Sequence, residues 1–251
     1  MENHPPNLNP PFGLQLFFAQ RIIYGHTVGA ATRNDLMIRL ERRLGRDIAR
    51  RAFWLTQEHT SRLVSSASHP SGTVADGFFL RETGTVGMIR TADCTPLFFW
   101  DDTGETAGLI HIGWRGLAGG ILDNWVRMLN KFQSNLPDMN IWLGPAIDGK
   151  CYVVGKELPA MFPQPGAEFW GFARDDHAQW TLDIRNGITN LLQAAGIPGH
   201  RIRRSDICTF CTNEFPSYRR EGPDCGRIMN FILRNPHPPS GPGKEGPEER
   251  A

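Results

Sequence analysis

Apolar residues recur at helical spacing in three segments of the chain, which has 251 residues. A potential cap at Asn34 and the apolar stripe behind it predict a first helix, and a second apolar face begins after Gly116. A third helix is predicted near residues 185–195, ending at Gly196, because glycine is common just beyond a helix. The first two faces comprise Leu36, Met37, Leu40 and Leu44, and then Leu117, Ile121, Leu122, Trp125, Met128, Leu129 and Phe132.

Short apolar runs elsewhere predict β-strands. In the run 107–114, His111 and Gly113 share one face, opposite Ile110 and Ile112. Strands and helices do not alternate regularly, and the chain has no phosphate-loop or dinucleotide-binding glycine motif. The pattern therefore favours an α+β domain with a large mixed sheet. The predicted strands lie at 86–90, 96–100, 107–114, 141–144 and 201–208.

The two ends of the chain differ in composition from the middle. Residues 1–12 are rich in proline and asparagine, and residues 235–251 are rich in proline, glycine and charge. Both segments are predicted to be disordered, because they lack residues that could join a core. Residues 13–234 then form a single domain, and with 40% hydrophobic residues the chain can bury a core without disulfide bonds.

The net charge and the number of cysteines limit which binding partners and which cellular compartment we expect. The 27 basic and 26 acidic residues leave a net charge of +1, which gives no electrostatic footprint for nucleic acid or an anionic membrane. The chain has no apolar run of about 18 residues, so no membrane span is predicted. Its N-terminal residues lack the features of an export signal. With five cysteines, an odd number, we expect a cytoplasmic protein with free thiols or metal ligands, as a monomer or a homodimer.

Three short segments carry residue types that bind metal ions: QEH at 57–59, TADC at 91–94 and HIGWRG at 111–116. They offer His59, Cys94 and His111, a thiol and two imidazoles, which suit zinc with an open fourth position, or copper. Asp93 is predicted to orient a ligand or to transfer a proton. Arg115 lies in a glycine-flanked turn directly after a strand, where an anion could bind.

A second group of cysteines is an alternative candidate for the functional site. Cys208 and Cys211 form a CxxC motif, and Cys225 follows. The motif suits a redox centre or a structural zinc site. A structural site would need a fourth ligand, and in sequence only His237 lies nearby. Cys151 is predicted to be structural.

These segments resemble the multicopper polyphenol oxidase, or laccase-domain, family, whose members are also described as purine nucleoside phosphorylases and peptidoglycan-editing factors. The resemblance implies a layered α+β domain with central mixed β-sheets flanked by helices, a laccase-domain or cysteine-hydrolase-like fold. It also implies that His59, Cys94 and His111 are the metal ligands. The matching stretches are WLTQEH (54–59), ADGFF (75–79), TADCTPLFFWD (91–101), GLIHIGWRGLAGGIL (108–122), LGPAIDGKCYVVG (143–155), DICT (206–209) and SYRREGPDCGR (217–227).

The resemblance further implies a purine nucleoside and phosphate as substrates. The implied reaction is phosphorolysis of adenosine, inosine, guanosine and methylthioadenosine, with adenosine deamination as an additional activity. His59, Cys94, His111 and Asp93 are the predicted catalytic residues. The predicted substrate-binding residues are Arg21, Arg115, Arg219 and Arg220. The segment 22–35 departs from the family pattern, which leaves the preferred substrate open.

Three other functions remain open at this point. Cys94 with His111 as its base would suit a thiol hydrolase or amidase acting on peptidoglycan precursors. Copper-dependent phenol oxidation is a second alternative, although the chain has only eight histidines for the several copper sites it would need. A non-catalytic nucleoside-binding protein is the third. His26, in the divergent segment, is the best further histidine for the pocket.

Overall fold

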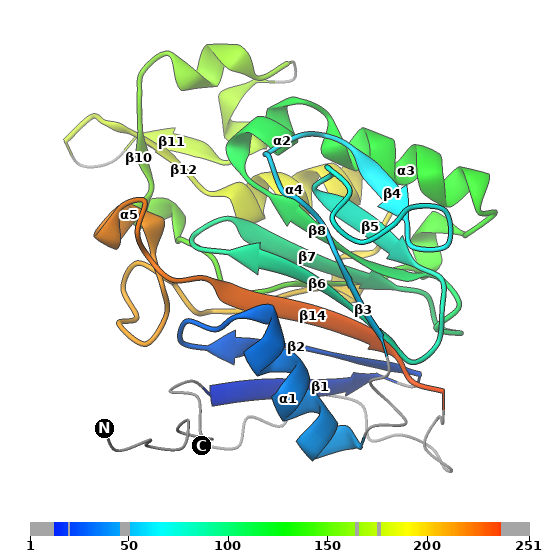
Figure 1. Ribbon diagram of the computed structural model, residues 1–251. Helices are drawn as coiled ribbons and strands as arrows, with labels where there is room; N and C mark the ends of the chain where they lie inside the picture. Colours follow the sequence, from blue (N-terminus) through cyan, green and yellow to red (C-terminus); the bar gives the residue numbers. More distant parts are fainter. Residues whose placement is uncertain (1–12, 20, 46–50, 164–165, 175–176, 237–251) are drawn as a thin grey trace, which may run out of the picture.

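The computed structural model describes residues 13–236 except 20, 46–50, 164–165 and 175–176 (Figure 1). Most of the two terminal segments predicted to be disordered lies outside the described residues. Two large mixed sheets and a small one form the framework, with helices on the outside. This architecture confirms the predicted α+β class with central mixed sheets.

The first sheet has five strands in the order β1-β2-β14-β6-β3. Strand β14, near the C-terminus, lies between β2 and β6 and pairs antiparallel with both, whereas β3 runs parallel to β6. Helix α1 (Arg33–Leu44) packs Leu36 and Leu40 onto this sheet (Figure 1). The strands are β1 (Gly13–Ala19), β2 (Ile22–Val28), β14 (Ile228–Arg234), β6 (Thr85–Thr91) and β3 (Arg51–Trp54).

The second sheet has six strands in the order β13-β9-β7-β8-β5-β4. Its central strands are antiparallel, and its two outer strands, β13 and β4, pair parallel with their neighbours. The strands are β13 (Ile202–Arg204), β9 (Asn140–Leu143), β7 (Thr95–Trp100), β8 (Ala107–Ile112), β5 (Gly77–Leu80) and β4 (Leu63–Ser65).

Three helices pack their apolar faces on this second sheet: α2 (Trp114–Ala118), α3 (Ile121–Lys131) and α4 (Ile184–Ala194). A small sheet of β10 (Val153–Val154), β12 (Trp180–Leu182) and β11 (Phe172–Arg174) lies beside α4. The short helix α5 (Tyr218–Glu221) precedes β14. The 3-10 helices are Leu136–Asp138, Gly149–Cys151, Leu158–Met161, Ala167–Trp170 and Gly199–Arg201.

The core between the two large sheets is aromatic. Phe98 of β7 lies 4.8 Å from Trp142 of β9 and 5.6 Å from Tyr24 of β2, measured between ring centroids. Phe78 and Phe98 are fully buried. Burial of one such side chain stabilises the fold by roughly 1.5–3 kcal/mol, so these contacts join the sheets.

Element boundaries differ from the predicted ones for local reasons. The N-cap of α1 is Thr32 rather than Asn34, because Thr32 and Asp35 form a reciprocal capping box. The apolar face after Gly116 is divided into α2 and α3 at Gly120, whose φ of 77° is left-handed. Of the run 201–208, only Ile202–Arg204 is a strand. Within the described residues, none of the helices has the length and apolar character needed to cross a membrane.

Candidate functional site

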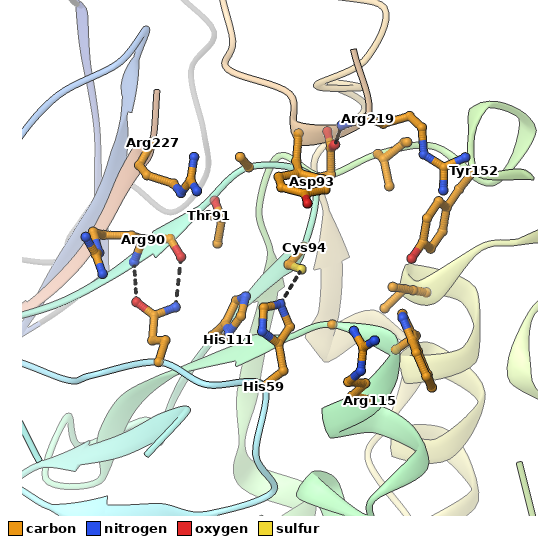
Figure 2. A pocket seen from close by; sticks show the side chains of 17 residues that line it. His59, Arg90, Thr91, Asp93, Cys94, His111, Arg115, Tyr152, Arg219 and Arg227 are labelled. Carbon is orange, nitrogen blue, oxygen red and sulfur yellow. Dashed lines mark hydrogen bonds between the residues drawn. The ribbon is translucent and has the colours of Figure 1, made fainter. Parts of the chain in front are cut away.

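Three predicted ligands converge from three segments of the fold. His59 lies in the loop after β3, Cys94 in the turn between β6 and β7, and His111 in β8. Their ligand atoms all lie within 4.8 Å of one another. Cys94 Sγ is 3.7 Å from His59 Nε2, and the two imidazole rings meet edge to face at 4.8 Å (Figure 2).

A buried carboxylate holds the imidazole of His111 and the backbone of His59. Asp76 is fully buried, and its Oδ1 accepts a hydrogen bond of 2.8 Å from His111 Nδ1. This contact leaves the other ring nitrogen of His111 for Cys94 or a metal ion. The carboxylate also accepts backbone N–H groups of His59 at 3.1 Å and Thr60 at 2.6 Å. These bonds hold His59 in its left-handed conformation, with φ of 57°. Asp76 was not singled out from the sequence, although it lies in the matching stretch ADGFF.

The electrostatics of the three residues favour a charged ligand set. Burial alone would raise the pKa of Cys94, but His111 and His59 lower it to about 6. Burial alone would lower the pKa of His111, but Cys94 and Asp76 raise it to about 9. Without a metal ion, these opposite shifts favour a thiolate–imidazolium pair near neutral pH.

The shape of the site also fits a metal ion. A Cβ at position 113 would lie 2.8 Å from His59 Cδ2 and 3.1 Å from Cys94 Sγ, so only glycine leaves both side chains in place. A thiolate with two imidazoles is a suitable donor set for zinc and for copper. The residues present therefore fit a borderline transition-metal ion.

The ligand set opens into a cavity of about 440 Å³ that four arginines line. Two of them, Arg115 and Arg219, were predicted. Arg115 lies in the first turn of helix α2, directly after β8, with its guanidinium 4.4 Å from the ring of Trp114. Arg219 lies 4.9 Å over the ring of Tyr152. Figure 2 shows Arg115 and Tyr152 on one side of Cys94, and the other two arginines on the opposite side.

Those other two, Arg90 and Arg227, were not singled out as site residues. The amide of Gln57 fixes the backbone of Arg90 through two hydrogen bonds of 2.8 Å. Burial and the nearby Arg33 and Arg227 hold the pKa of Arg90 below its ordinary value. Neither Arg90 nor Arg227 forms an ion pair with a carboxylate in the part of the chain that the structure describes. Their positions in the sequence offered a signal, since Arg90 precedes TADC and Arg227 ends SYRREGPDCGR.

Asp93 positions the turn that carries Cys94. It is buried with a left-handed φ of 84°. Its Oδ1 accepts the Thr209 hydroxyl at 2.6 Å, and its Oδ2 accepts the Ser217 hydroxyl at 3.1 Å and the Arg219 backbone N–H at 2.7 Å. Of the two predicted roles, these bonds favour orientation, because both carboxylate oxygens are occupied.

Two predicted substrate-binding residues, Arg21 and Arg220, are not among the residues that line this cavity. The guanidinium of Arg220 donates to the carbonyls of Thr209 and Phe210, both at 2.8 Å, and so holds a loop instead. Arg21 directly precedes β2. The first residue of β2, Ile22, pairs with Arg234, the last residue of β14. Arg227, by contrast, directly precedes β14, so the whole strand separates these two arginines.

His26 also lies outside the cavity. It is buried in the core, where its ring stacks 5.8 Å from Trp142 and tilts 5.7 Å from Phe215. Burial lowers its pKa to about 4, so the ring is neutral. Its place on β2, whose alternate residues face the second sheet, explains why it points to the core rather than the pocket.

Comparisons with known proteins agree with the fold and the motifs. Residues 31–235 match the family model described as multi-copper polyphenol oxidoreductase laccase. The chain is 34% identical over 169 residues to "Purine nucleoside phosphorylase YlmD" of Geobacillus stearothermophilus. The aligned region covers 63% of this chain and only 60% of that protein. It is 32% identical over 181 residues to "Purine nucleoside phosphorylase YfiH" of Escherichia coli, covering 71% of this chain and 72% of that one.

The fold comparison covers more of the chain. The crystal structure of YlmD from Geobacillus stearothermophilus superposes with a TM-score of 0.74 at 24% identity, covering 90% of this chain and 100% of that one. This likeness concerns the fold, whereas the family match extends over most of the sequence. The chain therefore belongs to the multi-copper polyphenol oxidoreductase laccase family.

Proposed function

We propose that the chain is a metal-dependent purine nucleoside phosphorylase acting on adenosine, inosine, guanosine and methylthioadenosine. The observation that carries the proposal is the single cavity that joins the His59, Cys94 and His111 set to four arginines. The names of the two aligned relatives support the same reaction class.

The metal ion is proposed to be zinc, held by His59, Cys94 and His111, with copper as the alternative. When bound, it would supply Lewis-acid polarisation of a substrate oxygen or a water molecule. Asp76 orients His111 through Nδ1 and fixes the backbone of His59, so the ligands need little rearrangement.

Arg90 and Arg227 are proposed to bind the phosphate. Two guanidinium groups without a carboxylate partner repel each other, and an anion between them would remove that repulsion. Arg115 and Arg219, on the other side of Cys94, are then available to the nucleoside. Tyr152 offers an aromatic face there, against which a purine ring could stack.

In this arrangement a phosphate oxygen attacks the anomeric carbon of the ribose. The glycosidic C–N bond breaks, its electron pair passes to the base nitrogen, and that nitrogen takes up a proton. The products are the free purine and ribose 1-phosphate, or 5-methylthioribose 1-phosphate when the substrate is methylthioadenosine. The arginines contribute by positioning phosphate and by stabilising its charge. With water in place of phosphate and attack on the purine ring, we expect adenosine to give inosine and ammonia as an additional activity.

Arg227→Ala tests the phosphate assignment. Zinc-loaded protein is incubated with inosine and varied phosphate, and free hypoxanthine is measured. Loss of a charged hydrogen bond to phosphate should raise the KM for phosphate at least about tenfold. The exposed Arg204→Ala is the matched control and should leave the KM unchanged. If the zinc-loaded protein releases no free base from any of the four nucleosides, the proposed function is wrong.

The thiolate–imidazolium pair favours a second candidate, a Cys94/His111 thiol hydrolase or amidase acting on peptidoglycan precursors. A chelator separates the two functions, because Cys94 cannot both hold a metal ion tightly and act as a free nucleophile. Loss of activity on chelation, restored by zinc, supports the metal-dependent reaction. Activity that survives chelation but not iodoacetamide supports the thiol mechanism.

A further inference from the structure

A second sulfur cluster lies outside the His59, Cys94 and His111 set. The Sγ atoms of Cys151, Cys208 and Cys211 all lie within 4.8 Å of one another, and those of Cys151 and Cys211 are 3.2 Å apart. Cys151 ends the 3-10 helix Gly149–Cys151, whereas the CxxC motif follows β13. The residue beside the CxxC motif is therefore Cys151, which the sequence predicts to be structural, and not Cys225, which follows the motif in sequence. Cys225 instead contacts Arg227, with Nη1 2.9 Å from Sγ.

Backbone geometry brings these cysteines together. An isolated parallel bridge joins Ala146 to Cys208, and the Thr209 N–H donates to the Ala146 carbonyl at 3.1 Å. The segment 146–151 therefore lies beside the CxxC loop. The N–H of Asp148 donates to Cys208 Sγ at 3.3 Å, which adds a bond from one segment to the sulfur of the other.

Cys208 is surrounded by hydrogen-bond donors in the manner of a metal-bound thiolate. Backbone N–H groups of Asp148, Cys211 and Phe210 all donate to its sulfur. Such donors stabilise a thiolate that binds a metal ion. With the three Sγ atoms within 4.8 Å of one another, a cation bound between them would balance their charge as thiolates.

We propose that Cys151, Cys208 and Cys211 form a second metal site, which takes a thiophilic divalent cation, zinc. Zinc–sulfur bonds of about 2.3 Å in a tetrahedron place sulfur atoms roughly 3.8 Å apart, close to the spacing already present. The fourth position is open to solvent, because Cys211 is exposed. Asp148 does not supply it, since its carboxylate is occupied by the Lys150 N–H and by Arg185.

The site joins a segment of the cavity wall to a second segment that supports the wall from behind. Tyr152 follows Cys151 directly and lines the cavity. Thr209 follows Cys208 directly and donates to Asp93, the neighbour of Cys94. A metal ion at the cysteine cluster therefore ties these segments together and stabilises the cavity wall, without contacting the proposed catalytic ligands.

Metal content of the full chain, purified under reducing conditions with zinc, tests the proposal. Wild type should carry about two equivalents of zinc, one for each ligand group. Cys211→Ser should lower this to about one, Cys94→Ala should also leave about one, and the double variant should carry none. Cys225→Ser, outside both groups, is the matched control and should keep both. Because Cys211 is exposed, its substitution should not prevent folding, which circular dichroism checks.

Cobalt gives a second measurement at this site alone. In the Cys94→Ala background, bound cobalt should show sulfur-to-metal charge-transfer absorption, and adding Cys211→Ser should abolish it. The proposal is overturned if Cys211→Ser keeps both zinc equivalents, or if Cys94→Ala carries no zinc. Since Cys94→Ala removes the other ion, failure of this site is distinguishable from failure of the proposed phosphorylase.

Discussion

The carboxylate of Asp76 lies 2.8 Å from Nδ1 of His111, with no exposure to solvent. The same carboxylate accepts the backbone N–H of His59, at 3.1 Å. One buried side chain therefore orients the imidazole of His111 and fixes the backbone of His59, although the two histidines come from different parts of the chain. This relationship makes Asp76 the main positioning residue of the proposed metal centre.

Asp76→Asn should weaken metal binding at the His59, Cys94 and His111 site. The amide is neutral and cannot accept at both of its former oxygens, so it cannot keep both the bond to the His111 imidazole and those to the backbone N–H groups of His59 and Thr60. Loss of such a supporting contact typically lowers metal affinity 10- to 100-fold. Competition with a chromophoric chelator in the Cys211→Ser background measures the affinity of this site alone. The exposed Asp123→Asn serves as control, and equal affinities in both variants would show that Asp76 does not position the ligands.

Gly113→Ala should displace the ligands while leaving the fold intact. Its Cβ would lie 2.8 Å from His59 Cδ2 and 3.1 Å from Cys94 Sγ, which is closer than such atoms pack. We expect zinc content at this site to fall well below that of wild type, as elemental analysis would show. Gly166→Ala is the matched control, because nothing lies within 4 Å of a Cβ there. Full metal content in Gly113→Ala would contradict the ligand geometry.

Cys94 of the metal-free chain should react with iodoacetamide at unusually low pH. His111 and His59 outweigh burial and lower the pKa of its thiol to about 6. A lowered pKa means that the thiolate fraction, and with it the alkylation rate, rises as pH increases through about 6. The rate is followed by mass spectrometry of the Cys94 peptide. In His111→Ala the midpoint should move upward, and an unchanged midpoint would exclude the thiolate–imidazolium pair.

His26 should make the free energy of unfolding decrease as the pH falls below neutral. Burial lowers its pKa from 6.5 to about 4, so below pH 6.5 the unfolded chain binds a proton that the folded chain does not. The stabilisation is present above pH 6.5 and is lost as pH falls toward 4, by about 3 kcal/mol for a shift of that size. Urea unfolding at pH 7 and pH 4 measures it. His26→Phe keeps the aromatic ring but cannot titrate, and should lose about 3 kcal/mol less between the two pH values than wild type does.

Part of this structure could be predicted from local patterns in the sequence. The faces of α1, α3 and α4 follow from the 3.6-residue period, and the three ligand-type residues stand at the ends of apolar runs. The start of α1 was misplaced because both Thr32 and Asn34 are residue types that cap helices, and only the capping box with Asp35 selects Thr32.

Contacts between segments that are distant in sequence could not be predicted from such local patterns. Insertion of β14 between β2 and β6 decides that Arg227 lies at the cavity and Arg21 at the other end of the sheet. Likewise, the bridge between Ala146 and Cys208 brings Cys151 to the CxxC motif. Neither contact has a local pattern in the sequence, because each depends on how distant segments pack.

The most direct test of the central claim is phosphate-dependent release of hypoxanthine from inosine by zinc-loaded wild type and Cys94→Ala side by side. We predict release by wild type that requires phosphate, and a rate at least about 100-fold lower in Cys94→Ala, since the variant lacks the ligand that completes the metal centre. Equal rates in the two proteins, or no release by wild type, would contradict the account.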